Sequence, residues 1–134
     1  MTAGGKNVAP SLIENMLKAS PYVKEAVTIG DRRSYLTALI GIDREAVSDW
    51  ATRRGIAFTT YRDLTEKPEV QELIAGEVRR VNRDLASAEQ IKKFRLIPKE
   101  LDHEDGELTA TMKVKRAILH DRFRDLVDAL YRSA

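Results

Sequence analysis

Apolar residues recur along the chain at two different spacings, and each spacing predicts one kind of element. From Pro10 onward, apolar side chains lie three or four positions apart, which is typical of one face of a helix that ends before Pro21. Two denser apolar runs, 23–29 and 35–42, follow on either side of a short loop that begins at Gly30. Because such a loop favours a hairpin, the two runs are predicted to pair as antiparallel strands.

The rest of the chain is predicted to be mostly helical, with one more strand. Asp43 is predicted to cap a helix that stops near Gly55, and residues 65–85 are predicted to form one long amphipathic helix. A short strand at 94–98 and a last helix that carries Ile118 complete the pattern. The order α-β-β-α-α-β-α indicates an α+β domain. Its small antiparallel or mixed sheet would have about three strands plus a short hairpin, with helices on its flanks.

The composition is typical of one globular domain. The chain has 134 residues, 43% of them hydrophobic and 33% charged, which is enough to bury one core without disulfides or metals. The lack of cysteines excludes thiol catalysis and is compatible with a cytoplasmic location. The net charge of +2 is too small to favour nucleic acid as a partner. No apolar stretch approaches the roughly 20 residues that span a bilayer, so no transmembrane segment is expected, while peripheral membrane contact remains open.

The N-terminal segment is the first candidate for ligand contact. Gly4 and Gly5 allow the backbone to approach a ligand closely or to take positive φ, and Lys6 and Asn7 follow them. Two glycines are a weak signal, because a tight turn that leads into the next helix explains them more simply. The residues alone therefore favour a turn, with a lysine beside it.

A basic cluster near the C-terminus is the second candidate. Lys113, Lys115 and Arg116 follow an acidic turn and lie close to Thr109 and Thr111. Lysine is a compact cation on a long flexible stem, which suits it to reach a phosphate or carboxylate oxygen. The two threonines can fix the loop through hydrogen bonds to local backbone. A solvated start of a helix is the commoner origin of such a cluster, so both interpretations stay open on these residues alone.

Other polar groups give weaker signals. His103 and His120 lack partners at metal-ligand spacing, so both are predicted to lie on the surface and no metal site is expected. The acidic run 102–107 lacks the spacing of a calcium loop and is predicted to be a solvated turn. Trp50 lies on the apolar side of its helix and is expected in the core. The sequence contains no glycine-rich phosphate loop and no nucleophile–histidine–acid set.

Taken together, the two candidate segments resemble a known family. Its signatures are GGKNVAPSLIE at 4–14, SPYVKEAVTIGD at 20–31, YLTALIGID at 35–43 and ELTATMKVKR at 107–116. They resemble the C-terminal domain of AMP-forming adenylating enzymes, and the closest branch is the long-chain fatty acyl-CoA synthetases. The resemblance covers nearly the whole chain, and the motifs follow the order of the family.

The resemblance implies a role for both segments. In this family a large N-terminal domain binds ATP and the fatty acid, and the small C-terminal domain moves between two poses. Lys113 then corresponds to the lysine that contacts the carboxylate and the α-phosphate during acyl-adenylate formation, and Thr109, Thr111 and Arg116 support its loop. Residues 4–7 correspond to the glycine loop that lines the pantetheine channel of CoA during thioester formation.

The resemblance also implies reactants and a partner. The reaction would convert a fatty acid, ATP and CoA to acyl-CoA, AMP and diphosphate, with Mg²⁺ bound mainly by the other domain. The partner would be the chain's own N-terminal adenylation domain. Residues 1–134 are expected to form only the C-terminal lobe, to begin just after the hinge and to be inactive alone.

One departure and one alternative accompany this assignment. Ala110 stands where the family usually has proline, which predicts a less rigid loop before Lys113. The alternative is a non-enzymatic α+β module whose cations Lys113, Lys115 and Arg116 bind an anionic partner. A nucleic-acid binder would show steep salt dependence, and the nearly neutral charge disfavours it.

Overall fold

A mixed three-stranded sheet forms the centre of the domain. The computed structural model describes residues 9–30, 35–102, 104–111 and 113–131. The strands are β1 (Val23–Ile29), β2 (Leu36–Ile42) and β3 (Ile91–Leu96), in the order β1-β2-β3. β1 and β2 pair antiparallel, as predicted, whereas β3 runs parallel to β2. The predicted α+β class with a small mixed sheet is confirmed.

Helices and one short turn make up the other elements of the described chain. They are α1 (Pro10–Lys18), α2 (Arg44–Arg53), α3 (Tyr61–Glu66), α4 (Pro68–Asn82), the 3₁₀ turn η1 (Ser87–Glu89), α5 (Arg116–Arg122) and α6 (Arg124–Leu130). The cap predicted for α2 is confirmed, because the side chain of Asp43 accepts a hydrogen bond from the backbone N–H of Ala46 at 3.0 Å. After α2 the chain turns at Gly55, whose φ of 72° favours glycine.

Two helices predicted as single pieces are divided. Between α3 and α4, Lys67 is extended, with φ −67° and ψ 129°, because the residue before a proline avoids the helical region and Pro68 follows. The single helix predicted over 65–85 is therefore wrong in its bounds. The last helix is also divided, at Phe123, where φ is −108° and ψ is 30°.

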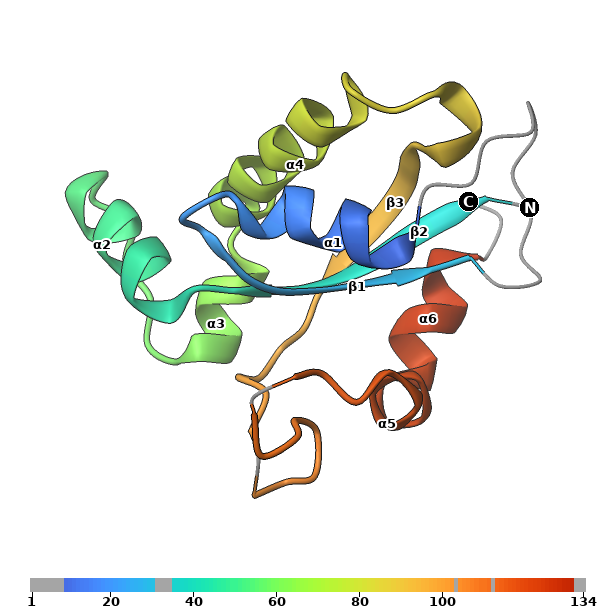
Figure 1. Ribbon diagram of the computed structural model, residues 1–134. Helices are drawn as coiled ribbons and strands as arrows, with labels where there is room; N and C mark the ends of the chain where they lie inside the picture. Colours follow the sequence, from blue (N-terminus) through green and yellow to red (C-terminus); the bar gives the residue numbers. More distant parts are fainter. Residues whose placement is uncertain (1–8, 31–34, 103, 112, 132–134) are drawn as a thin grey trace.

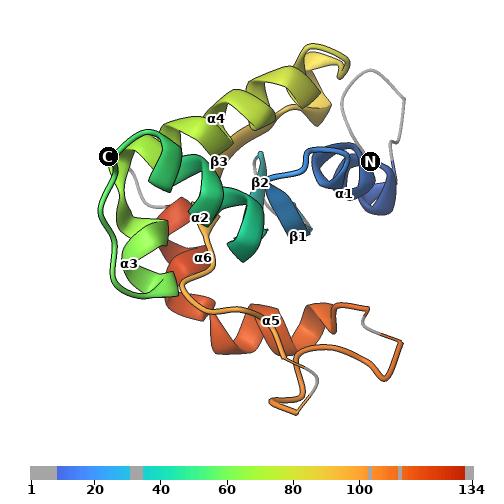
Figure 2. The same ribbon diagram turned by 90° about the vertical axis from the view of Figure 1, so that its left-hand side faces the viewer.

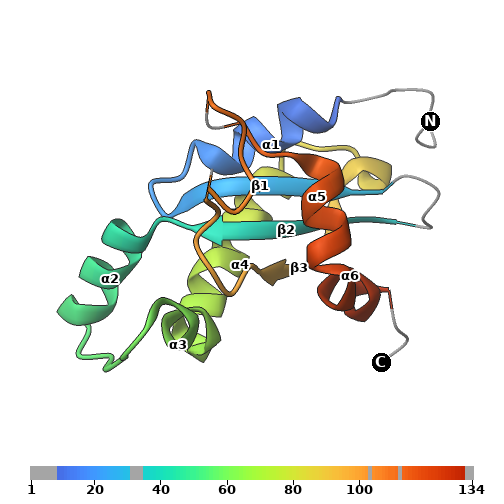
Figure 3. The ribbon, with the colours of Figure 1, turned by 90° about the horizontal axis from the view of Figure 1, so that it is seen from below.

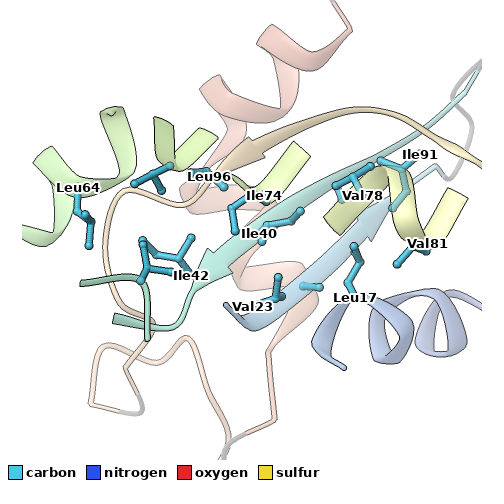
Figure 4. Close-up of a cluster of buried hydrophobic side chains, with 14 of the residues drawn as sticks. Leu17, Val23, Ile40, Ile42, Leu64, Ile74, Val78, Val81, Ile91 and Leu96 are labelled. Atoms are coloured by element: carbon cyan, nitrogen blue, oxygen red, sulfur yellow. The ribbon is translucent and has the colours of Figure 1, made fainter. Parts of the chain in front are cut away.

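Helices cover both faces of the sheet. α1 and α4 lie on one face, α5 and α6 lie on the other, and α2 and α3 extend beyond one end (Figures 1 and 2). Successive strand residues point to opposite faces, so β2 contributes to two cores. Ile40 belongs to the core under α1 and α4, which Figure 4 shows, and Leu39 belongs to the core under α5 and α6.

The start of α3 offers a prediction about pH. Asp63 accepts a hydrogen bond from the backbone N–H of Thr59 at 2.9 Å, and Thr60 accepts one from the N–H of Asp63 at 3.0 Å. The bond from Thr59 is the main reason that the pKa of Asp63 lies below its usual range. Because the pKa is lower in the folded state, the ionised carboxylate stabilises the fold above the unfolded pKa. That stabilisation is lost as the pH falls through the folded pKa.

We expect Asp63→Asn to lower the urea midpoint of unfolding at pH 7, because the amide replaces the charged acceptor. The difference from the wild type should shrink once the pH drops below about 3, where an ordinary aspartate is mostly protonated. Urea titrations at both pH values check this. If the difference between the two urea midpoints were the same at both pH values, the charge of the Asp63 carboxylate would not contribute to stability.

Candidate functional site

The basic segment near the C-terminus forms a short hairpin outside the sheet. The backbone N–H of Lys115 donates to the carbonyl of Glu107 at 2.9 Å, and that of Thr109 donates to the carbonyl of Lys113 at 2.7 Å. An antiparallel bridge joins Leu108 and Val114 between these two bonds. In Figure 1 this orange segment projects below the sheet, on the side of α5. These bonds place Lys113 near the tip of a closed hairpin.

Side-chain hydrogen bonds of the threonines close the tip further. Oγ1 of Thr109 accepts from the backbone N–H of Lys113 at 3.0 Å and lies 3.1 Å from Oγ1 of Thr111. The predicted bond from a threonine to local backbone is confirmed for Thr109, whereas Thr111 bonds to the other hydroxyl. The backbone of Lys113 is thus fixed by two bonds to Thr109, although Ala110 stands at the position where the family usually has proline.

The side chain of Lys113 takes no part in these backbone contacts. It is exposed, and no ion pair or hydrogen bond reaches its Nζ from the described residues. Lys115 is exposed as well and begins the approach to α5. The ammonium group of Lys113 can therefore contact an anion that comes from outside the domain, while its backbone stays held.

Arg116, by contrast, binds other residues of the domain, although its side chain is 51% exposed. Its Nη1 donates to the carbonyl of Thr28 at 3.1 Å, and its Nη2 donates to Oε1 of Glu14 at 2.9 Å. The contact with Glu14 joins residues 102 positions apart, which are the ends of the first and the last family signature. Arg116 thus fixes the start of α5 directly behind the hairpin. Local spacing gave no indication that Glu14 would be its partner.

The base of the hairpin is held by a buried carboxylate that sequence analysis missed. Glu107, which was expected in a solvated turn, is only 1% exposed, so that expectation is wrong. Its oxygens accept from Nζ of Lys99 at 2.8 Å, the N–H of Asp102 at 3.0 Å and the guanidinium of Arg122 at 3.2 Å. A buried carboxylate needs such partners. Lys99 also binds Asp105, and this hydrogen bond lowers the pKa of Asp105.

The remaining candidates have different outcomes. Residues 4–7 and His103 lie outside the described residues, and His120 is exposed. Trp50 is half-buried against the core under α1 and α4, with the guanidinium of Arg54 4.8 Å from its ring centre. Groups of three or more acidic or histidine side chains able to hold a cation do not occur within the described ranges. Nor does any helix there have the length and apolar character to cross a bilayer.

Comparisons with known proteins agree over the whole chain. The family model described as AMP-binding enzyme C-terminal domain matches residues 1–134. The long-chain-fatty-acid–CoA ligase FadD15 of Mycobacterium tuberculosis is 40% identical over 132 residues, which are 98% of this chain and 22% of that relative. Long-chain-fatty-acid–CoA ligase 1 of Cavia porcellus is 33% identical, over 96% of this chain and 19% of that relative. The chain therefore spans about a fifth of the length of these relatives.

A solved structure has the same fold. The adenylation domain of the carboxylate reductase from Mycobacterium chelonae superposes with a TM-score of 0.72 at 26% identity, over 97% of this chain and 19% of that one. The fold of this chain is thus one that also occurs within a larger adenylation domain.

Proposed function

The chain belongs to the AMP-binding enzyme C-terminal domain family, and from that membership we propose that it acts as the mobile lobe of a long-chain fatty acid–CoA ligase. The whole enzyme would convert a fatty acid, ATP and CoA to acyl-CoA, AMP and diphosphate. The names of relatives such as FadD15 support the class of substrate. Its partner would be a large N-terminal adenylation domain, and its location the cytoplasm.

The observation that carries the proposal is the exposed ammonium group of Lys113 on a hairpin whose backbone is held. In the first half-reaction, a carboxylate oxygen of the fatty acid forms a bond to the α-phosphorus of ATP. The bond from that phosphorus to the bridging oxygen breaks, and its electron pair leaves with diphosphate. Lys113 would lie beside the carboxylate and the α-phosphate oxygens, where a positioned cation stabilises the negative charge brought together in the transition state.

The second half-reaction would use the other family segment. The thiol sulfur of CoA forms a bond to the acyl carbonyl carbon, its proton is released, and AMP leaves with the electron pair of the broken mixed-anhydride bond. Residues 4–7 are proposed to line the path of the pantetheine arm, since glycines leave room for a narrow chain. Mg²⁺, which would neutralise phosphate charge, would be held mainly by the large domain.

The alternative of a non-enzymatic module loses support from the same geometry. That module would bind an anionic partner through Lys113, Lys115 and Arg116. Because the guanidinium of Arg116 already binds Glu14 and Thr28, an anionic partner would have to share it with these two residues. Two exposed lysines would remain, which is a small basis for a dedicated anion site.

The experiment that tests the proposed function compares the chain alone with the full-length ligase that carries it. We expect the 134-residue chain to form no acyl-CoA from a long-chain fatty acid, ATP and CoA, while the full-length protein does. Removal of this domain should abolish acyl-adenylate formation, measured as fatty acid-dependent release of diphosphate. Acyl-CoA made by the chain alone, or full adenylation by the truncated protein, would contradict the proposal.

A further inference from the structure

The backbone of Thr28, in β1, is hydrogen-bonded by two side chains on the side of the strand that faces away from β2. Among the strands of the described residues, β1 lies at the edge of the sheet, with β2 as its one neighbour. The N–H of Thr28 donates to Oε2 of Glu14 at 2.8 Å, and its carbonyl accepts from Arg116 at 3.1 Å. In an antiparallel strand, both backbone groups of one residue point to the same side. Those of Thr28 face away from β2, so Glu14 and Arg116 take the place of a neighbouring strand.

The two side chains also bind each other. Nη1 of Arg116 lies 2.8 Å from Oε2 of Glu14, and Nη2 donates to Oε1 at 2.9 Å, so the guanidinium engages both carboxylate oxygens. The hydroxyl of Thr28 donates to the same carboxylate at 3.1 Å. Glu14 is only 8% exposed, and charge-assisted hydrogen bonds of this kind are the stronger ones in proteins. We call Glu14, Thr28 and Arg116 the edge clamp.

The edge clamp joins elements on opposite faces of the sheet. Glu14 belongs to α1, whose residues pack in the core shared with α4, whereas Arg116 begins α5, which lies across the other face (Figure 3). Because Lys113 precedes Arg116 by a few residues, the clamp lies at the end of the returning hairpin strand. The other strand is held at Glu107. Arg116 therefore helps to hold the hairpin that carries Lys113 against the sheet edge.

We propose that Glu14 and Arg116 are positioning residues for acyl-adenylate formation, because they fix the direction from which Lys113 enters the reaction centre. This proposal rests on the proposed function, which places Lys113 there. Glu14 and Arg116 do not touch the reacting atoms themselves. A misplacement of about 1 Å of a catalytic group lowers a rate by about 100-fold, so a loosened hairpin has a measurable cost.

The test uses Glu14→Gln and Arg116→Lys in the full-length ligase. Glu14→Gln keeps the size of the side chain but removes its charge, and Arg116→Lys keeps the charge but loses the fork that spans Thr28 and Glu14. In single-turnover reactions, we expect the rate constant of acyl-adenylate formation to fall about tenfold for each variant. The double variant should be no slower than the slower single one, because both residues belong to the same edge clamp and their effects are not additive.

Two further readouts separate positioning from a loss of folded protein. The amplitude of the single turnover counts competent molecules, and we expect it to stay at the wild-type value. The transfer of a supplied acyl-adenylate to CoA should also keep its rate constant. Arg79→Lys is the matched control, since Arg79 pairs with Glu72 on the solvent side of α4, far from the hairpin, and should change neither step.

The outcomes distinguish a failure of the positioning role from a failure of the proposed function. An unchanged rate constant of adenylation in both clamp variants, with Lys113→Ala impaired, would overturn the positioning role alone. A parallel fall of both half-reactions and of the amplitude would show that the clamp only stabilises the fold, and would overturn it too. Normal adenylation by Lys113→Ala would remove the proposed function, and the positioning role with it.

Discussion

Replacing Lys113 by alanine is expected to slow acyl-adenylate formation by about 100- to 1000-fold in the proposed full-length ligase, the usual cost of losing one positioned electrostatic contact. The ammonium group is exposed and without a partner among the described residues, whereas the backbone of Lys113 is held by Thr109. Alanine should leave those backbone bonds intact, since they do not involve the side chain. The loss would thus come from the missing charge, measured as fatty acid-dependent release of diphosphate.

Lys115→Ala provides the matched control, because Lys115 is a nearby exposed cation on the same segment. We expect it to leave the rate of adenylation close to that of the wild type. The transfer of a supplied acyl-adenylate to CoA should be unaffected by Lys113→Ala, since that step is proposed to use the other family segment, residues 4–7. Equal losses for the two lysines would mean that the overall positive charge of the segment matters, and not one positioned cation.

The second large effect concerns stability. Ile40→Ala is expected to lower the free energy of unfolding by about 2–5 kcal/mol, the range for large-to-small changes in a well-packed core. Ile40 is fully buried in the central strand, with side chains of α1 and α4 around it (Figure 4). The alanine would leave a cavity at residue 40. Because residues from several helices and strands surround that position, they cannot all shift to fill the cavity. Urea unfolding of the chain followed by circular dichroism measures the loss.

Leu12→Ala is the control for this prediction. Leu12 is also a large aliphatic residue, but it is 53% exposed on α1. Its replacement should change the free energy of unfolding by less than about 0.5 kcal/mol, as for most surface changes. If both variants lost the same stability, the core under α1 and α4 would not be the main contributor that the packing indicates.

The elements that sequence analysis predicted well are those with a local signal. The hairpin of β1 and β2 follows from two dense apolar runs on either side of a short loop, and the start of α2 follows from a capping aspartate, Asp43. By contrast, β3 begins at Ile91, three residues earlier than predicted. Its start was not predicted because Lys92, Lys93 and Arg95 occupy its exposed positions and dilute the apolar pattern. The break between α5 and α6 at Phe123 was not predicted, because neither proline nor glycine occurs there.

The candidate site shows the same division between local and distant signals. The bond from Thr109 to the backbone of Lys113 was predictable, because such contacts form within a few residues. The burial of Glu107 was not, since its cationic partners Lys99 and Arg122 lie 8 and 15 positions away on different sides of it. The pairing of Glu14 with Arg116 depends on the fold as a whole, so only the structure reveals it.

The edge clamp also affects whether another polypeptide can pair with β1. An exposed sheet edge is a template on which another polypeptide can add a strand of its own, and proteins protect such edges with charges or covering segments. In β1 the apolar residues Val27 and Ile29 flank Thr28, a composition that favours strand addition. With both backbone groups of Thr28 already bonded to charged side chains, an incoming strand finds no partner at this point. The edge clamp therefore protects this part of the sheet edge from strand addition, while the neighbouring hairpin keeps the side chain of Lys113 exposed.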